Sequence, residues 1–144
     1  MGETRIPLAD NPRSEAKVLA KLNKKRIFVF SPDRDLAQSL SMLFENHFEI
    51  TCETSMGNLS KRIAAVAPDL LIVDLHTFSS DVMLELNIVE SCCAKVPVVI
   101  LRAYNRLRSD VEEMVQRTAK IIFYKPFNAE EVVRSIHSLL KVDQ

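Results

Sequence analysis

The sequence contains little of what usually marks an exported, membrane or nucleotide-binding protein. Its 144 residues include two glycines and no tryptophan, so a glycine-rich loop that could cradle phosphates is absent. No apolar run approaches the roughly 20 residues that a membrane-spanning helix needs. The amino terminus, MGETRIPLADNPRS, is polar and contains prolines where an export signal would have an apolar core. We therefore expect no contact with a membrane.

Neither sign of charge predominates. Lysine plus arginine equals aspartate plus glutamate, at 19 each, so the net charge gives no electrostatic reason to expect a nucleic-acid partner. The content of 47% hydrophobic and 26% charged residues is typical of a soluble globular protein. A chain of this length can bury a sizeable core, and we expect one main domain.

The cysteines are few and odd in number: Cys52, Cys92 and Cys93. This number fits reduced thiols in the cytoplasm better than a disulfide framework. The adjacent pair at 92 and 93 would point in different directions on a helix, and no histidine or further cysteine stands nearby at a ligand spacing. We interpret these cysteines as small apolar residues and predict a cytoplasmic protein.

Residues 1–25 differ from the remainder of the chain and are predicted to form an amino-terminal arm. Within this arm, Ser14 could cap a short helix over residues 15–25. The apolar residues on one face of that helix would be Val18, Leu19 and Leu22. Two interpretations remain open: a solvated leader, or an extra helix that docks on the domain or on a partner.

From residue 26 onward, short apolar runs alternate with segments that have helical periodicity. The predicted strands are 26–30, 48–54, 69–75, 97–101 and 121–124. The predicted helices are 35–47, 58–67, 81–93, 110–119 and 129–141, and 142–144 form a tail. Such alternation predicts an α/β fold, with a five-stranded parallel sheet in flavodoxin-like order and five helices on its two faces.

In such sheets the functional site lies at the carboxyl ends of the strands, near the switch in strand order. This rule selects candidate residues from position alone. Residues 31–33 follow the first strand, and Asp74 to Thr77 stand at the end of the third. Arg102 to Tyr104 follow the fourth strand and Lys125 follows the fifth.

Four motifs occur in order, RIFVFSPDRDL, PDLLIVDL, PVVILRA and YKPF. Over residues 26–141 they resemble the receiver domain of two-component response regulators. The resemblance implies that Asp74 occupies the phosphoacceptor position and that Lys125–Pro126 is the family's lysine–proline pair, often joined by a cis peptide. It also implies an acidic pair after the first strand that binds magnesium, a hydroxyl after the fourth strand, and a switch aromatic on the fifth.

The sequence departs from that pattern at most of these positions. Ser31–Pro32 replaces the acidic pair, Arg102 replaces the hydroxyl residue and Ile122 replaces the aromatic. A hard dication prefers carboxylate oxygens, which neither serine nor proline supplies. Asp33 could reach the site, but we favour a role in capping the first helix. We therefore predict no metal or other cofactor, with Asp33 and Asp74 as the only ligands if residual magnesium binding exists.

Lys125 and Arg102 are then the predicted counterions of Asp74. A guanidinium is permanently charged and its planar fork suits a carboxylate, so we expect Arg102 to fill the space of the magnesium ion. In the alternative, Arg102 swings outward to the surface, because arginine side chains often extend toward water.

These substitutions favour a pseudo-receiver, which is a signalling domain that acts by protein–protein contact, is independent of phosphorylation and is not an enzyme. The alternative is an atypical phosphoacceptor in which Asp74 takes a phosphoryl group and Arg102 replaces metal and hydroxyl. A small-ligand module of the same build is a third hypothesis, without a glycine-rich loop to support it.

The predicted partner is a protein, either a histidine kinase, an output protein or a second copy of the chain. In receivers the usual contact surface is formed by the fourth helix, the fifth strand and the fifth helix. Here these are 110–119, 121–124 and 129–141, whose mixed charges could fix the register of a dimer.

Overall fold

The computed structural model describes residues 24–75, 79–92 and 95–141. Most of the predicted arm, Cys93 and the tail at 142–144 lie outside these described residues. Lys24 and Lys25 are not helical, so the helix predicted for residues 15–25 cannot extend to its expected end. Among the residues described, no helix is long and apolar enough to cross a membrane.

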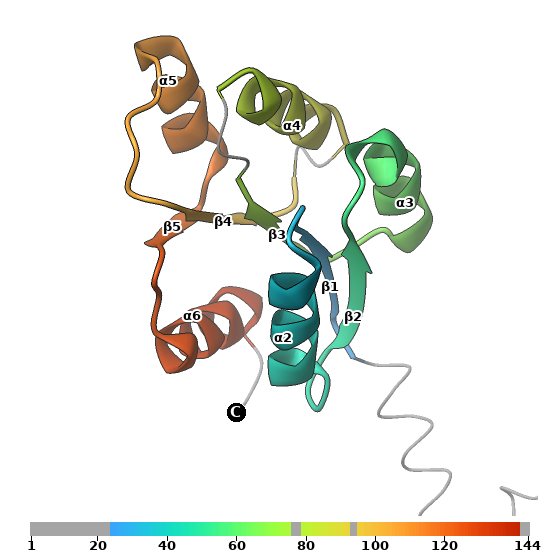
Figure 1. Ribbon diagram of the computed structural model, residues 1–144. Coiled ribbons are helices and arrows are strands. Elements are labelled where there is room, and N and C mark those ends of the chain that lie inside the picture. Colours follow the sequence, from blue (N-terminus) through green and yellow to red (C-terminus); the bar gives the residue numbers. More distant parts are fainter. Residues whose placement is uncertain (1–23, 76–78, 93–94, 142–144) are drawn as a thin grey trace, which may run out of the picture.

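The chain alternates regularly between strands and helices, as Figure 1 shows. The strands are β1 (Arg26–Phe30), β2 (Glu49–Glu53), β3 (Leu70–Asp74), β4 (Val98–Arg102) and β5 (Ile121–Tyr124). The helices are α2 (Arg34–Phe44), α3 (Leu59–Val66), α4 (Ser79–Cys92), α5 (Ser109–Thr118) and α6 (Ala129–Leu140), with a 3-10 turn at Met56–Asn58. All pairings are parallel, in the order β2-β1-β3-β4-β5. The predicted flavodoxin-like sheet is confirmed.

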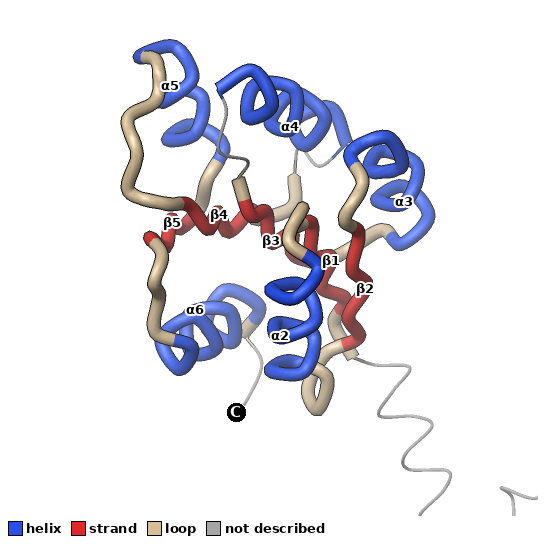
Figure 2. The backbone as a smooth tube through the Cα atoms, in the orientation of Figure 1, coloured by secondary structure: helices blue, strands red, loops and turns tan. Residues whose placement is uncertain are grey.

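The sheet forms a central layer with helices on both sides (Figure 2). Helices α2 and α6 cover one face, and α3, α4 and α5 cover the other. Successive side chains of a strand point to opposite faces, so Ile27 and Val29 pack under α2 and α6 while Phe28 and Phe30 pack under the other three helices. Strands β3 and β4 are buried along their whole length, which explains why the first four residues of each are apolar.

Two helices begin at side-chain caps that the sequence supplies. The Asp33 carboxylate accepts hydrogen bonds from the backbone N–H groups of Asp35, at 3.0 Å, and Leu36, at 3.2 Å, at the start of α2. The Asn128 side chain accepts one from the Glu131 N–H, at 3.1 Å, at the start of α6. Each cap pairs an N–H group that the helix itself leaves without a partner.

We predict that Asn128→Ala lowers the free energy of unfolding by about 1 kcal/mol, because the first turn of α6 loses its cap. Asn58→Ala is the matched control, since Asn58 occupies the same position before α3 but makes no side-chain cap hydrogen bond. Urea denaturation of both variants measures the difference. Equal losses would contradict the prediction.

Candidate functional site

The carboxyl-terminal edge of the sheet gathers the candidate residues. Asp74 is the last residue of β3 and Arg102 the last of β4, while Ser31 directly follows β1 and Lys125 directly follows β5. Strand β1 neighbours β3, and β3 neighbours β4, so the ends of these strands are adjacent. The strand order switches at β1, where parallel α/β proteins commonly bind ligands.

Asp74 lies at the centre of a closed polar cluster. Its side chain is 3% exposed, and its Oδ1 forms an ion pair with the Lys125 ammonium group. Its Oδ2 accepts a hydrogen bond of 2.7 Å from the Ser31 hydroxyl. Both carboxylate oxygens are therefore engaged by groups of the chain itself. We call Ser31, Asp74 and Lys125 the aspartate cluster.

Ser31 is fully buried and holds this arrangement in place. Its hydroxyl oxygen accepts a hydrogen bond of 3.0 Å from the Asp33 N–H. The same oxygen lies 3.1 Å from the Asp33 carbonyl, but the single hydroxyl hydrogen favours the closer, charged oxygen of Asp74. A residue at a metal-ligand position of the resembled family thus acts here as a hydrogen-bond donor.

The residues present do not suit a magnesium ion. Asp33 uses a carboxylate oxygen to cap α2, as the sequence analysis favours, and Pro32 has no ligating side chain. Asp74 already has one partner on each oxygen, so it could offer a metal only its remaining lone pairs. Within the described ranges, no group of three or more histidine, cysteine, aspartate or glutamate residues could hold a metal ion. Magnesium prefers several oxygen ligands, including carboxylates, and this donor set lacks them.

Arg102 pairs with Glu112 of α5 and not with Asp74, which corrects the predicted Arg102–Asp74 pair. Its Nη1 donates to the Glu112 carboxylate at 2.8 Å, and its Nη2 donates to the Asn105 carbonyl at 3.2 Å. The alternative of an outward swing also fails, since the side chain is only 3% exposed. Lys125 and Ser31 already engage Asp74, so a second cation gains little there, while Glu112 supplies a carboxylate to Nη1 of Arg102.

The Glu112 carboxylate accepts a second hydrogen bond, of 2.8 Å, from the Gln116 side chain. The hydrogen bond from Arg102, followed by that from Gln116, holds the pKa of Glu112 below its usual value. No motif or spacing in the sequence marks Glu112 as the partner of Arg102. The one available signal is general: an arginine that ends a buried strand needs an acid nearby.

Two tyrosines complete the surroundings of Arg102. The guanidinium carbon lies 5.4 Å from the centre of the Tyr124 ring, a distance typical of cation–π contacts. The Tyr104 ring stacks on Tyr124 with centroids 4.4 Å apart and remains 79% exposed. We call Arg102, Glu112 and Tyr124 the arginine cluster. Ile122, at the position of the family's switch aromatic, is half-buried against the core under α3, α4 and α5.

We predict that Glu112→Gln lowers the free energy of unfolding by about 1–2 kcal/mol at pH 7, because buried Arg102 loses its anion while solvent at half-exposed Glu112 moderates the loss. The folded pKa of Glu112 is depressed, so its contribution is complete above an unfolded value near 4.5 and is lost as the pH falls through the folded pKa. The difference in free energy of unfolding between Glu112→Gln and the unmodified protein should therefore become smaller as the pH falls.

Glu113→Gln is the control, since this exposed neighbour has no ion pair or side-chain hydrogen bond with any described residue. Denaturation curves measured from pH 7 to acid pH should give Glu113→Gln nearly the same free energy of unfolding as the unmodified protein. A pH-independent loss in Glu112→Gln would show that the ion pair is not its cause.

No protein-family model matches the sequence, and no curated protein matches it. Solved structures do. The signal receiver domain of a DNA-binding response regulator from Colwellia psychrerythraea 34H is 22% identical with a TM-score of 0.66, over 81% of this chain and 98% of that one.

Two further structures have the same TM-score of 0.66. The receiver domain of the Francisella response regulator 1452 is 21% identical over 81% of this chain and 97% of its own. The N-terminal signal receiver domain of a two-component response regulator from Bacteroides fragilis is 19% identical, over 83% and 97%. At these identities the likeness concerns the fold. The chain has the fold of response-regulator receiver domains.

Proposed function

We propose that this chain is a signal-transduction module of the pseudo-receiver type, which acts through protein–protein contact without phosphorylation of Asp74. The observation that carries this proposal is the aspartate cluster. Lys125 and Ser31 engage both oxygens of Asp74, and the one carboxylate among residues 31–33, that of Asp33, caps α2. The receiver fold supports a role in signalling, and the cluster supports independence from phosphorylation.

The chemistry of phosphoryl transfer explains why the cluster matters. An attacking carboxylate must approach a donor whose charge spreads over its phosphoryl oxygens, and a metal normally neutralises that charge. In this chain Lys125 neutralises Asp74 itself, and Arg102 is held by Glu112. Neither cation is available to a phosphoryl group without breaking a buried or half-buried ion pair. The module therefore works as a binding surface and not as an enzyme.

The alternative function, an atypical phosphoacceptor, is supported by one observation. Asp74 and Lys125 stand together at the edge of the sheet, as a phosphoacceptor and its lysine would. In that case Lys125 would transfer its charge to the phosphoryl oxygens, and Arg102 would have to leave Glu112 to replace metal and hydroxyl. Phosphorylation of Asp74 would then break both the Asp74–Lys125 and the Arg102–Glu112 ion pairs.

The proposed contact surface is the face formed by α5, β5 and α6. Tyr104, which stacks on Tyr124 of β5, presents an exposed aromatic ring beside it. Large aromatic side chains are frequent anchors of protein interfaces. The proposed partners are a histidine kinase, an output protein or a second copy of the chain, in the cytoplasm.

We predict that incubation with acetyl phosphate and magnesium leaves the intact mass of the protein unchanged, since Asp74 is already neutralised. Mass spectrometry of the whole protein measures this directly. A receiver domain with a complete acidic pair, treated in parallel, confirms that the donor is active. A stoichiometric phosphoryl adduct that Asp74→Asn abolishes would overturn the pseudo-receiver proposal in favour of the phosphoacceptor.

We also predict that millimolar magnesium produces no saturable rise in the free energy of unfolding. A metal that bound the folded state specifically would stabilise it by about 2.7 kcal/mol at a hundredfold excess over its dissociation constant. Thermal unfolding in magnesium chloride, compared with sodium chloride of equal ionic strength, isolates specific binding from screening. A saturable gain that disappears in Asp74→Asn would contradict the prediction.

A further inference from the structure

A groove of about 350 Å³ lies at the amino-terminal edge of the sheet, opposite to the edge that carries Asp74. It is lined by residues 95–98, which lead into β4, and by residues 117–120, which run from the last turn of α5 toward β5. The Lys120 N–H donates a hydrogen bond of 2.7 Å to the Val98 carbonyl. The two walls of the groove are therefore held together by the backbone.

The groove carries an excess of positive charge. Its cations are Lys95, Arg117 and Lys120, all with exposed side chains, and none of the described lining residues is acidic. Arg117 forms an ion pair of 3.4 Å with Glu90 of α4, whereas Lys95 and Lys120 have none with any described residue. Three cations thus stand against one carboxylate, in a chain whose net charge is zero. Since both partners of the Arg117–Glu90 pair are exposed, that pair is weak and Arg117 can turn to another anion.

Part of this positive charge serves the ends of two helices. Helix α4 ends at Cys92 and α5 at Thr118, both close in sequence to the lining residues. The carbonyl end of a helix carries about half a negative charge, so two such ends balance about one cation. Glu90 balances a second one. One of the three cations is left without a counter-charge, and it favours an anion in the groove.

Thr118 adds a hydroxyl group to the lining of the groove. Its Oγ1 is buried and has no hydrogen-bond partner among the described residues. A buried polar atom without a partner costs free energy, so it calls for a partner from outside the chain. Threonine in a helix commonly occupies two rotamers about the Cα–Cβ bond. Rotation about this bond would let the hydroxyl donate a hydrogen bond to an anion in the groove.

We propose that this groove binds a phosphate group, either free or carried by a small organic molecule. Lys95, Arg117 and Lys120 are its counterions, and the hydroxyl of Thr118 is a further donor. A phosphate group offers several oxygens to such donors, and lysine and arginine are common phosphate ligands. The remaining lining residues are apolar and would contact an organic carrier. The proposal goes beyond the signalling function and does not depend on whether Asp74 takes a phosphoryl group.

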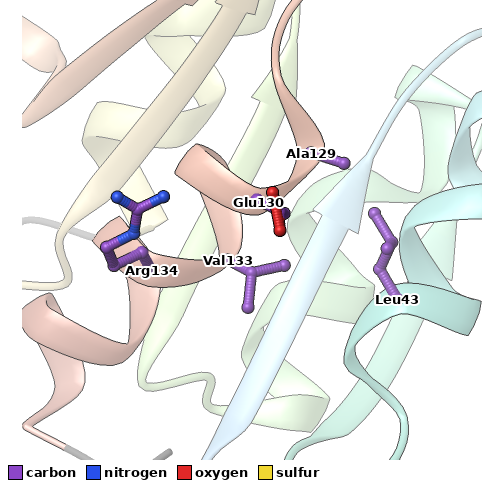
Figure 3. Close-up of a pocket in the computed structure, with 5 residues that line it drawn as sticks. All are labelled: Leu43, Ala129, Glu130, Val133 and Arg134. Atoms are coloured by element: carbon purple, nitrogen blue, oxygen red, sulfur yellow. The ribbon is translucent and has the colours of Figure 1, made fainter.

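A different groove, between α2 and α6, provides an internal comparison (Figure 3). Its lining consists of Leu43 of α2 and of Ala129, Glu130, Val133 and Arg134 of α6. Among these described residues, the single cation, Arg134, is accompanied by the single carboxylate, Glu130, so the charges cancel. We therefore expect a phosphate group to bind beside residues 95–98 and 117–120 and not between α2 and α6.

Amide NMR spectra of the full chain, recorded during the addition of inorganic phosphate, test the site directly. Saturable shifts are expected within residues 95–98 and 117–120 and not around Leu43 and Arg134. Sodium chloride of equal ionic strength, added to a second sample, separates specific binding from screening. Shifts that do not saturate, or that are equally large around Arg134, would overturn the proposal.

Variants of the lysines test the electrostatic part of the site. Lys95→Gln and Lys120→Gln should each weaken phosphate binding about two- to fivefold, as the loss of one exposed ion pair predicts. Lys61→Gln is the matched control, since this exposed lysine lies on α3 and outside the groove, and it should leave the affinity unchanged. If all three variants bind phosphate with the same affinity, the groove is not the site.

Thr118→Val separates phosphate binding from stability. Valine has nearly the shape of threonine but no hydroxyl group. The free energy of unfolding should not fall, because Oγ1 has no hydrogen bond to lose. The affinity for phosphate should fall about fivefold, as the loss of one hydrogen bond predicts. An unchanged affinity would overturn the assignment of Thr118 as a donor.

Phenyl phosphate distinguishes the two sources of the phosphate group. Binding tighter than that of inorganic phosphate assigns the apolar lining to an organic carrier, and equal binding assigns the site to free phosphate. Asp74→Asn should bind both probes as the unmodified protein does, because Asp74 lies at the other edge of the sheet. Shifts that vanish in Asp74→Asn would place the anion at the aspartate cluster and overturn the proposal. A phosphoryl adduct at Asp74 would overturn the proposed function and leave binding in the groove unaffected.

Discussion

The ion pair between Asp74 and Lys125 is the constraint on which the carboxyl-terminal edge of the sheet depends. Asp74 ends the fully buried strand β3, and a carboxylate in that position requires a counter-charge and hydrogen bonds. Lys125 supplies the charge from the end of β5, and Ser31 supplies a hydrogen bond from the end of β1. The aspartate cluster therefore joins the ends of three strands at one point. In the family that the sequence resembles, a metal would share this role.

Neutralisation of Asp74 by Lys125 explains what Arg102 does. A guanidinium at the end of β4 would find no uncompensated carboxylate on β3, so it turns to α5 and binds Glu112. Each charge in the aspartate and arginine clusters then has a partner of opposite sign. The arginine cluster also connects β4 to α5 and, through the Tyr124 ring, to β5. The Asp74–Lys125 and Arg102–Glu112 pairs thus stand where the resembled family has a cluster of carboxylates and a metal.

The sheet can be predicted from the sequence because each strand is marked by its own residues. The apolar runs that begin β3 and β4 are typical of strands covered on both faces, and no distant contact is needed to recognise them. It also places Asp74 and Lys125 at one edge, since strand ends meet there. The partner of Arg102 cannot be predicted in the same way. Glu112 lies ten residues later on a helix, and the distance between the two side chains depends on the path of the intervening loop. The predicted end of the amino-terminal helix at residue 25 is wrong for a similar reason. The Lys25 carbonyl bonds to the Glu49 N–H at the start of β2, a contact that local helical periodicity cannot reveal.

The substitutions at the site are coupled by charge. With two acidic residues after β1, Asp74 and those residues would carry three negative charges against Lys125, and only a metal could balance them. With Ser31 and Pro32 in their place, Lys125 alone balances Asp74. An arginine at position 102 would then leave an excess of positive charge, which Glu112 removes. The charges of Asp74 and Arg102 are thus both paired within the chain itself. In the pseudo-receiver proposed above, control therefore acts on the surfaces of the domain and not on Asp74.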